Sequence, residues 1–365
     1  MSETSAPRPF VVDAVIHGYN LTESNMVGSG ASMEEFAVGV YHHHKMFSPA
    51  DEYFHLTQAE FIDDWAPEDL AHAVFAESSA DMAVYHTVPM FDFWKDGSSP
   101  LEKGLAMRAK HPGRVLVYGA VNPLNTREAA TEAKRQVEEL GVDGIKLYPA
   151  SYYAGKTIGW RMDDPVIAFP IFEQLLELGI TNVAVHKAMP LGPAPLGPFK
   201  VDDVAGAAHE FPDMNFQIVH GGYAFVEETA LMLHKFPNIY VNLEATASYA
   251  MRRPKLFAQA IGEFLYWGTP EQIIFASGAP LTHPRPAIEA MLNFDMPKDL
   301  MEEYGYPAVD DAQRGLMVGG NLARIHGIDI EAQRAQVADD EFSQIQRANG
   351  GPAEPWSGLR AGASA

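Results

Sequence analysis

Eight short apolar or β-branched segments, each bounded by turn residues, recur along the chain. They span residues 10–17, 81–86, 114–121, 144–148, 182–186, 215–220, 238–243 and 272–277. Several are continuous apolar runs, such as residues 115–121. Runs of this kind favour parallel strands covered by helices over an exposed antiparallel sheet.

Helix-like stretches separate most of these segments, at residues 127–140, 165–178, 201–210, 225–235 and 254–266. Alternating strands and helices with eight strands predict an α/β fold, a (β/α)8 TIM barrel, over residues 1–327. An open doubly wound sheet is the alternative, but no Gly-x-Gly-x-x-Gly follows the first strand. Residues 328–365 are expected to form a helix at 330–347 and a tail, interpreted as a subunit-contact arm or a loose terminus.

Composition narrows the classes of partner. With 365 residues, 47% of them hydrophobic, the chain can bury a large core, which excludes disorder as the whole description. A net charge of −22 makes nucleic acid and anionic lipid unfavourable partners. No cysteine is present, so any metal must bind through nitrogen and oxygen. The first residues lack a basic start followed by an apolar run, and no apolar run reaches the roughly 18 residues of a membrane span, so a cytoplasmic location is expected.

Polar residues stand at the carboxyl ends of the predicted strands, where the active site of a TIM barrel gathers. One histidine at a strand end is more often structural than a ligand, but several together are harder to explain that way. Imidazoles and a carboxylate form the usual shell for zinc, iron or manganese. The strand ends are His17, His86, Asn122, Lys146 with Tyr148, His186, His220, Glu244 and Ser277, and the four expected ligands among them are His17, His186, His220 and Glu244.

Three further residues have two interpretations each. Asp13 points to the same side of its strand as His17 but lies ~13 Å deeper on an extended strand, so it holds a second metal only if the strand bends, and otherwise supports a ligand. His86 is either a ligand or a substrate contact. Lys146 is either a structural lysine paired with an acidic ligand, which we favour, or a carbamate bridge between two metals.

Two loops are expected to border the site. The first, residues 18–70, contains His42, His43 and His44 in one run. On a helix these point in three directions, so at most one or two can face the site, and the run is interpreted mainly as lid or subunit contact. The second is the proline-rich stretch at residues 190–198, which follows His186 and is expected to wall the same pocket.

The order of several short motifs resembles the amidohydrolase superfamily, in its amidohydrolase-related branch of aminocarboxymuconate semialdehyde decarboxylase and its relatives. The resemblance covers residues 10–327 and implies that His186 and His220 are the histidines of the fifth and sixth barrel strands, with His17 the second histidine of the His-x-His motif. The motifs are Val12-Asp13-x-x-x-His17, Gly144-Ile-Lys-Leu-Tyr148-Pro, Val185-His186, Ile218-Val-His220-Gly221-Gly222, Phe236-Pro-Asn-Ile-Tyr-Val-Asn, Ile274-Phe-Ala-Ser-Gly-Ala-Pro280 and Gly320-Asn321-x-Ala-Arg324.

The chain departs from that family pattern at two ligand positions. Val15 replaces the first histidine of His-x-His, and Gly278 replaces the aspartate of the last strand, while Glu244 adds a carboxylate at the seventh strand. A site rebuilt in this way resembles the 2-aminoisobutyric acid hydroxylases, an oxidative offshoot of the superfamily. That resemblance implies a dinuclear manganese/iron centre, O₂ as a reactant and a second amidohydrolase-like subunit as partner.

The leading hypothesis is therefore an O₂-dependent monooxygenase that hydroxylates a small amino acid such as 2-aminoisobutyrate. The alternative is a zinc-dependent hydrolase or nonoxidative decarboxylase of a small carboxylate, with His220 as general acid/base, and a third possibility is a non-catalytic subunit of a hetero-oligomer. An oligomer is expected in each case. The expected metal ligands are His17, His186, His220, Glu244, Asp13 and His86, the catalytic residues His220, His86 and Tyr148, and the substrate contacts Tyr19, Asn20 and Tyr148.

Overall fold

Eight parallel strands form one sheet in the computed structural model, which describes residues 8–28, 31–153, 156–190 and 194–362. The strands follow one another in chain order around the sheet, because only the hairpin β5–β6 interrupts the numbering. The eight are β1 Val12–Ile16, β2 Met82–His86, β3 Val115–Ala120, β4 Gly144–Leu147, β7 Asn182–His186, β8 Asn215–Val219, β9 Ile239–Asn242 and β10 Ile273–Ile274.

Backbone contacts between the last and first strands close the sheet. The backbone N–H of Ala14 donates to the carbonyl of Phe275 at 3.2 Å, and that of His17 donates to Ala279 at 2.7 Å. Ile16 and Ala279 form a parallel bridge beyond the regular part of β10. The predicted TIM barrel is confirmed, and each predicted strand segment corresponds to one strand of the barrel.

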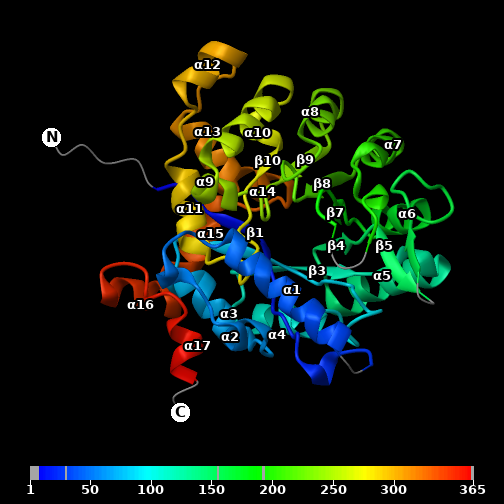
Figure 1. The fold of residues 1–365 in the computed structure, drawn as a ribbon, viewed down its shortest axis with the longest axis horizontal. Coiled ribbons are helices and arrows are strands. Elements are labelled where there is room, and N and C mark those ends of the chain that lie inside the picture. Colours follow the sequence, from blue (N-terminus) through cyan, green and yellow to red (C-terminus); the bar gives the residue numbers. More distant parts are fainter. Residues whose placement is uncertain (1–7, 29–30, 154–155, 191–193, 363–365) are drawn as a thin grey trace.

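Helices surround the barrel, and those predicted between strands are confirmed with bounds shifted by a few residues (Figure 1). The helices up to the last strand are α1 Ala31–Phe47, α2 Gln58–Ile62, α3 Pro67–Ala71, α4 Leu101–Lys110, α5 Arg127–Leu140, α6 Phe169–Glu177, α7 Asp202–Glu210, α8 Val226–Lys235, α9 Ser248–Arg252 and α10 Pro254–Trp267. After it come α11 Pro284–Leu292, α12 Lys298–Tyr304, α13 Asp311–Gly315, α14 Asn321–Ile325, α15 Ile330–Val337, α16 Glu341–Asn349 and α17 Ser357–Gly362.

Two insertions decorate the barrel. The long first loop carries α1, α2 and α3, and α1 runs across the front of the barrel in Figure 1. The hairpin of β5 (Ala150–Tyr153) and β6 (Lys156–Gly159) follows β4 directly and was not predicted. Its short polar strands lack the apolar alternation that makes a strand visible in sequence.

The single helix predicted at residues 330–347 is wrong: the chain forms α15 and α16 there. The break is at Asp340, whose side chain caps the second helix by accepting the N–H of Ser343 and also pairs with Arg114 at 2.6 Å. An aspartate that caps a new helix and binds the barrel competes with continuation of the first helix. Residues 330–362 pack on the chain's own barrel, with α16 and α17 close to α3 in Figure 1.

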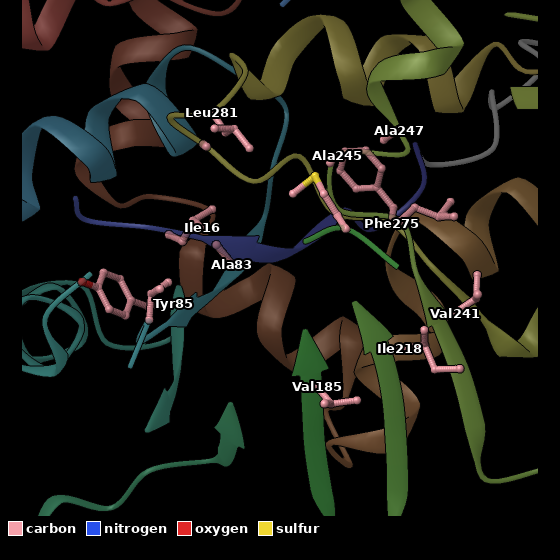
Figure 2. Close-up of a cluster of buried hydrophobic side chains, with 14 of the residues drawn as sticks. Ile16, Ala83, Tyr85, Val185, Ile218, Val241, Ala245, Ala247, Phe275 and Leu281 are labelled. Carbon is pink, nitrogen blue, oxygen red and sulfur yellow. The ribbon is translucent and has the colours of Figure 1, made fainter. Parts of the chain in front are cut away.

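The apolar core has two layers. Inside the barrel lie side chains such as Val12, Val84 and Ile274. The larger layer lies between the strands and the helices, and Figure 2 shows part of it, with Val185, Ile218 and Val241 on three neighbouring strands. Successive side chains of a strand point to opposite faces of the sheet. His186, the residue after Val185, therefore points away from this outer layer.

Within the described part of the chain, none of the helices combines the length and the apolar character needed to cross a lipid bilayer.

Candidate metal centre

The four expected ligands meet at the carboxyl ends of four strands. His17 follows β1, His186 ends β7, and His220 and Glu244 come just after β8 and β9. All four side chains are buried. Glu244 Oε1 lies 3.0 Å from Nε2 of His17, and Glu244 Oε2 lies 3.7 Å from Nε2 of His220. His220 Nε2 is also 3.0 Å from Nδ1 of His186.

The other ring nitrogen of each histidine is held by a backbone carbonyl. His17 Nδ1 donates to the carbonyl of His86 at 3.1 Å, and His220 Nδ1 donates to that of Glu244 at 3.3 Å. His186 Nε2 donates to the carbonyl of Met189 at 2.6 Å. A carbonyl can only accept, so in the neutral rings the proton is on these nitrogens and the opposite nitrogens carry lone pairs.

Those lone pairs face one another or the carboxylate of Glu244. His186 Nδ1 faces His220 Nε2, and His17 Nε2 faces a carboxylate oxygen, which is also an acceptor. Two acceptors at hydrogen-bond distance repel unless a proton or a cation lies between them. Backbone anchoring of the second nitrogen is also how proteins orient imidazoles that bind metals.

The three imidazole nitrogens and the carboxylate suit a divalent ion, although the side chains lie in pairwise contact with one another. Among the described residues, no group of three or more histidine or acidic side chains is already spaced as around an ion. Two donors that each lie about 2.1 Å from one ion are ~3.4 Å apart in a tetrahedral site. The three distances of 3.0, 3.0 and 3.7 Å bracket that value, so small side-chain movements admit the ion.

Glu244 occupies the space of the missing aspartate. Gly278 has a φ angle of 74°, and a Cβ atom built on it would lie 2.9 Å from Glu244 Cγ and 3.1 Å from Glu244 Oε1. No side chain at position 278 can therefore coexist with Glu244 as it is placed. At this corner of the site the carboxylate is therefore that of Glu244, after β9, and not that of a residue after β10.

Burial and mutual proximity fix the charges of the cluster. Burial lowers the pKa of His220 to about 4, and burial and the nearby His220 lower the pKa of His186 well below its usual value, so both rings are neutral at pH 7. Burial alone would raise the pKa of Glu244, but His220, His17 and Lys146 hold it well below the usual range. The site thus presents the neutral imidazoles of His186 and His220 and one carboxylate.

His86 and Lys146 are buried beside the cluster with unused polar atoms. Neither ring nitrogen of His86, nor Lys146 Nζ, nor Glu244 Oε2 has a hydrogen-bond partner among the residues that the structure describes. Burial and the charge of Lys146 lower the pKa of His86 well below its usual value, while burial lowers that of Lys146 to about 8 against the opposing effect of Glu244. Unpartnered buried groups of this kind mark places where a ligand completes the hydrogen bonding. Among the described residues no acidic side chain lies at hydrogen-bond distance from Lys146 Nζ, but Glu244 is near enough to favour its charged form. The interpretation of Lys146 as a structural lysine paired with an acidic ligand therefore stays a prediction.

Two tyrosines cover the imidazoles. Tyr19 stacks on His17 with ring centroids 5.2 Å apart, and Tyr148 stacks on His186 at 4.4 Å. Lys146 Nζ lies 5.6 Å from the centroid of the Tyr148 ring. Asn20 is placed differently, because its side-chain oxygen accepts from the N–H and hydroxyl of Thr22 and serves the loop. The contact of Asn20 with substrate stays a prediction that these bonds do not favour.

The carboxylate of Asp13 is hydrogen-bonded to Ser277, just beyond the last strand. It accepts the N–H of Ser277 at 2.8 Å and the hydroxyl of the same residue. Burial raises the pKa of Asp13 to about 7, against the effect of these hydrogen bonds. Asp13 therefore joins β1 to the end of β10 beneath the centre. Asn122 likewise serves its own loop, because its side chain accepts the N–H of Leu124.

The three histidines of α1 point in three directions, as predicted. His42 is exposed, and His43 is half-buried and stacks on Phe47. His44 is fully buried, with Nδ1 donating to the carbonyls of Pro280 and Leu281 and Nε2 accepting the N–H of Leu56. Both nitrogens of His44 are used, so this histidine fastens α1 to the loop after β10.

A pocket of about 30 Å³ lies near His186. Its lining includes Tyr148 and Phe199, and both rings also lie against His186. Ala194, from the proline-rich stretch at residues 190–198, and Phe199 line it, whereas residues 191–193 lie outside the described residues. That this stretch walls the pocket of the expected ligands stays a prediction. The remaining lining residues are Pro89, Met90, Asp92, Phe93, Ala150, Ser151 and Thr157.

Sequence reasoning missed Asn242, whose side-chain oxygen accepts the N–H of Glu244 at 3.2 Å. It also missed Gln217, which bonds Asn242 at 3.1 Å. The available signal was polar residues inside otherwise apolar strand segments, which in a barrel point into the interior.

The family comparison agrees with this arrangement. Residues 58–328 match the Amidohydrolase family. The chain belongs to the amidohydrolase family. Among curated proteins, none matches the sequence.

Solved structures similar to this amidohydrolase share its fold. An uncharacterised TIM-barrel protein from Bordetella bronchiseptica is 17% identical with a TM-score of 0.61, covering 89% of this chain and 99% of that chain. A 5-carboxyvanillate decarboxylase from Sphingomonas paucimobilis is 15% identical with a TM-score of 0.54, covering 89% and 100%. Another 5-carboxyvanillate decarboxylase, from Novosphingobium aromaticivorans with bound manganese, is 13% identical with a TM-score of 0.53, covering 90% and 99%.

Proposed function

We propose that this amidohydrolase is a metal-dependent enzyme that acts on a small carboxylate without oxygen, and that nonoxidative decarboxylation is its reaction. Two similar folds belong to carboxyvanillate decarboxylases, one of them holding manganese, which supports this reaction class and a divalent ion. The proposal replaces oxygen-dependent hydroxylation as the leading hypothesis, because nothing in the family match or the similar folds points to O₂.

The observation that carries the proposal is the carboxylate of Glu244 between the lone pairs of His17 and His220. With His186 these residues supply three nitrogens and a carboxylate for one ion. A bound divalent ion would supply Lewis-acid polarisation of a substrate oxygen. Because Glu244 fills the space above Gly278, the site keeps the carboxylate that loss of the usual aspartate would have removed.

Lys146 and His86 supply the groups that handle the substrate. The buried ammonium of Lys146 lacks an anionic partner at hydrogen-bond distance, and a substrate carboxylate provides one. In decarboxylation the bond from carbon to the carboxylate carbon breaks, CO₂ leaves, and the remaining carbon takes a proton. His86 has one N–H and one lone pair that no described residue uses, so it is the imidazole that can hold and move this proton. His220 Nδ1 is held by a backbone carbonyl and its Nε2 lone pair faces His186, which favours its role as a ligand over a general acid/base.

The experiment is anaerobic turnover of Mn(II)-loaded and Zn(II)-loaded protein with a panel of small aromatic and aliphatic carboxylates, followed by release of ¹³C-labelled CO₂. We expect release without oxygen and its loss after chelation. Release that persists in Lys146→Met and His86→Gln at the unchanged rate would contradict the assigned roles. No release with any of the carboxylates, together with O₂ consumption, would overturn the proposal.

Oxygen-dependent hydroxylation by a two-metal centre of the 2-aminoisobutyric acid hydroxylase type is the second candidate. The lone-pair nitrogen of His86 and Oε2 of Glu244 favour it, because neither has a hydrogen-bond partner among the described residues and both could bind a second ion. Two iron or manganese ions per chain and O₂-dependent hydroxylation of a small amino acid would support it. Assembly with a second amidohydrolase-like subunit and a contact role of residues 328–365 stay proposals, to be tested by mass measurement in solution.

A further inference from the structure

A continuous chain of buried hydrogen bonds lies beneath the centre, inside the barrel. The N–H of Glu244 donates to Asn242 Oδ1 at 3.2 Å, and Asn242 Nδ2 donates to Gln217 Oε1 at 3.1 Å. Gln217 Nε2 donates to the hydroxyl of Tyr118 at 2.9 Å, and this hydroxyl lies 2.8 Å from Nε2 of His326. The side chains of Asn242, Gln217 and Tyr118 are fully buried.

Each bond in this chain determines the next. The N–H of Glu244 requires the oxygen of Asn242, which leaves the Asn242 amide nitrogen to face the oxygen of Gln217. The Gln217 nitrogen then faces Tyr118, and the tyrosine proton goes to His326. Burial lowers the pKa of His326 to about 4, so at pH 7 this ring is a neutral acceptor. Every amide has one orientation, and a flip of either one would place like groups against each other.

The chain reaches two groups of the proposed site. It begins at the backbone of Glu244. One bond before its other end at His326, the ring of Tyr118 stacks on His86 with centroids 4.7 Å apart and planes at 15°. Neither nitrogen of His86 has a hydrogen-bond partner among the described residues, and the edge contact with the His17 ring is longer, at 6.4 Å. The close stack on Tyr118 therefore contributes most to the orientation of the His86 ring plane. Glycine at position 144 leaves space for the Tyr118 ring, because a Cβ atom there would lie 2.6 Å from Tyr118 Cε1.

We propose that Gln217 and Tyr118 are positioning residues, which hold the His86 ring and the Glu244 backbone in register with each other through this chain. Neither is a catalytic residue, because Gln217 contacts neither His86 nor a proposed ligand and Tyr118 acts through the stack. The inference rests on the proposed function for its effect on metal binding, but the placement of His86 is a property of the fold alone.

The test compares two substitutions of the same kind. Gln217→Leu breaks the chain at its centre, and Gln272→Leu removes an equally buried glutamine whose amide donates to the carbonyls of Leu233, Phe236 and Ile239, away from the site. The first readout is the ¹⁵N resonances of the His86 ring in metal-free protein. The second is the dissociation constant and electron paramagnetic resonance spectrum of Mn(II).

We expect Gln217→Leu to shift or broaden the His86 resonances and to weaken Mn(II) binding by ~10-fold, the lower end of the effect of residues that orient ligands. Gln272→Leu lowers Tm but changes neither readout. Tyr118→Phe, which keeps the stack and loses the hydroxyl, shifts the same resonances by less and serves if Gln217→Leu does not fold. Unchanged His86 resonances in both Gln217→Leu and Tyr118→Phe would overturn the inference. Wild-type protein that binds no Mn(II) would count against the proposed function, while the His86 resonances still decide the positioning role.

Discussion

The Cγ atom of Glu244 lies 2.9 Å from the position that a Cβ atom of residue 278 would take. Glycine at 278 and glutamate at 244 are therefore one structural unit: the first makes room for the second. The relationship explains how the chain keeps a carboxylate at this corner without the aspartate expected on the last strand.

Moving the carboxylate from position 244 to position 278 tests this relationship. Glu244→Gly should weaken Mn(II) binding by at least ~10-fold, since a lost ligand costs no less than a lost supporting residue. Gly278→Asp alone should also weaken binding, because its side chain meets Glu244. The double variant Glu244→Gly/Gly278→Asp should recover much of the affinity, and aspartate tolerates the positive φ better than most residues. Wild-type affinity in Gly278→Asp alone would show that the two side chains do not share the space.

Lys146→Met should stabilise the protein at pH 7. Burial lowers the pKa of Lys146 from 10.5 to about 8, and a shift of that size corresponds to ~3 kcal/mol of unfolding free energy. Below pH 8 the folded protein carries the full penalty of a buried ammonium, so the gain is complete there. It fades as the pH rises from 8 to 10.5, because the unfolded lysine also loses its proton.

Lys187→Met is the matched control for Lys146→Met. Lys187 is equally buried but pairs with Asp203 at 2.7 Å, so its removal leaves a buried carboxylate and should destabilise by about 3 to 5 kcal/mol. Denaturant unfolding at pH 7 and pH 10 measures both variants. Equal destabilisation by the two substitutions would contradict the unpartnered state of Lys146.

Trp356→Ala should release the C-terminal segment and the first loop together. The Trp356 side chain is fully buried and its indole N–H donates to the carbonyl of Phe54 at 3.0 Å, whereas its bond to Glu77 at 2.6 Å comes from the backbone N–H, which alanine keeps. We expect a loss of about 3 to 5 kcal/mol, as for other buried aromatic residues. Hydrogen exchange should show faster exchange at residues 52–56.

Tyr266→Ala provides the comparison for Trp356→Ala, because Tyr266 is 56% exposed and its truncation should change stability by no more than ~0.5 kcal/mol. If Trp356→Ala loses stability while residues 52–56 keep their slow exchange, the tryptophan does not hold the first loop.

Protonation of His220 should not weaken metal binding between pH 6 and pH 8. Protons compete with a metal for histidine only near or below the pKa of the free ligand, and burial places that of His220 at about 4. The affinity should therefore fall as the pH drops through about 5 towards 4. Mn(II) titrations from pH 4.5 to pH 8 measure this, and a tenfold fall between pH 7 and pH 6 would disprove it.

Much of the fold could be read from the sequence because its causes are local. Continuous apolar runs such as residues 115–121 indicate strands that are buried on both faces. The helix Arg127–Leu140 has the bounds that the sequence predicted. The hairpin β5–β6 and the break at Asp340 could not be read, because such short strands lack a pattern and the break depends on Arg114, which lies just before the distant strand β3.

By itself, the sequence determined the barrel and the candidate ligands His17, His186, His220 and Glu244, since the carboxyl ends of parallel strands must meet at one end of a barrel. Only the tertiary structure decided what each polar residue does there. It assigned Asp13 to Ser277 and His44 to the loop after β10, left the side chains of His86 and Lys146 without hydrogen-bond partners among the described residues, and placed Glu244 in the space above Gly278. The physical reason is that a side chain's hydrogen-bond partners and the space around it come from strands far apart in the chain, and no local pattern encodes them.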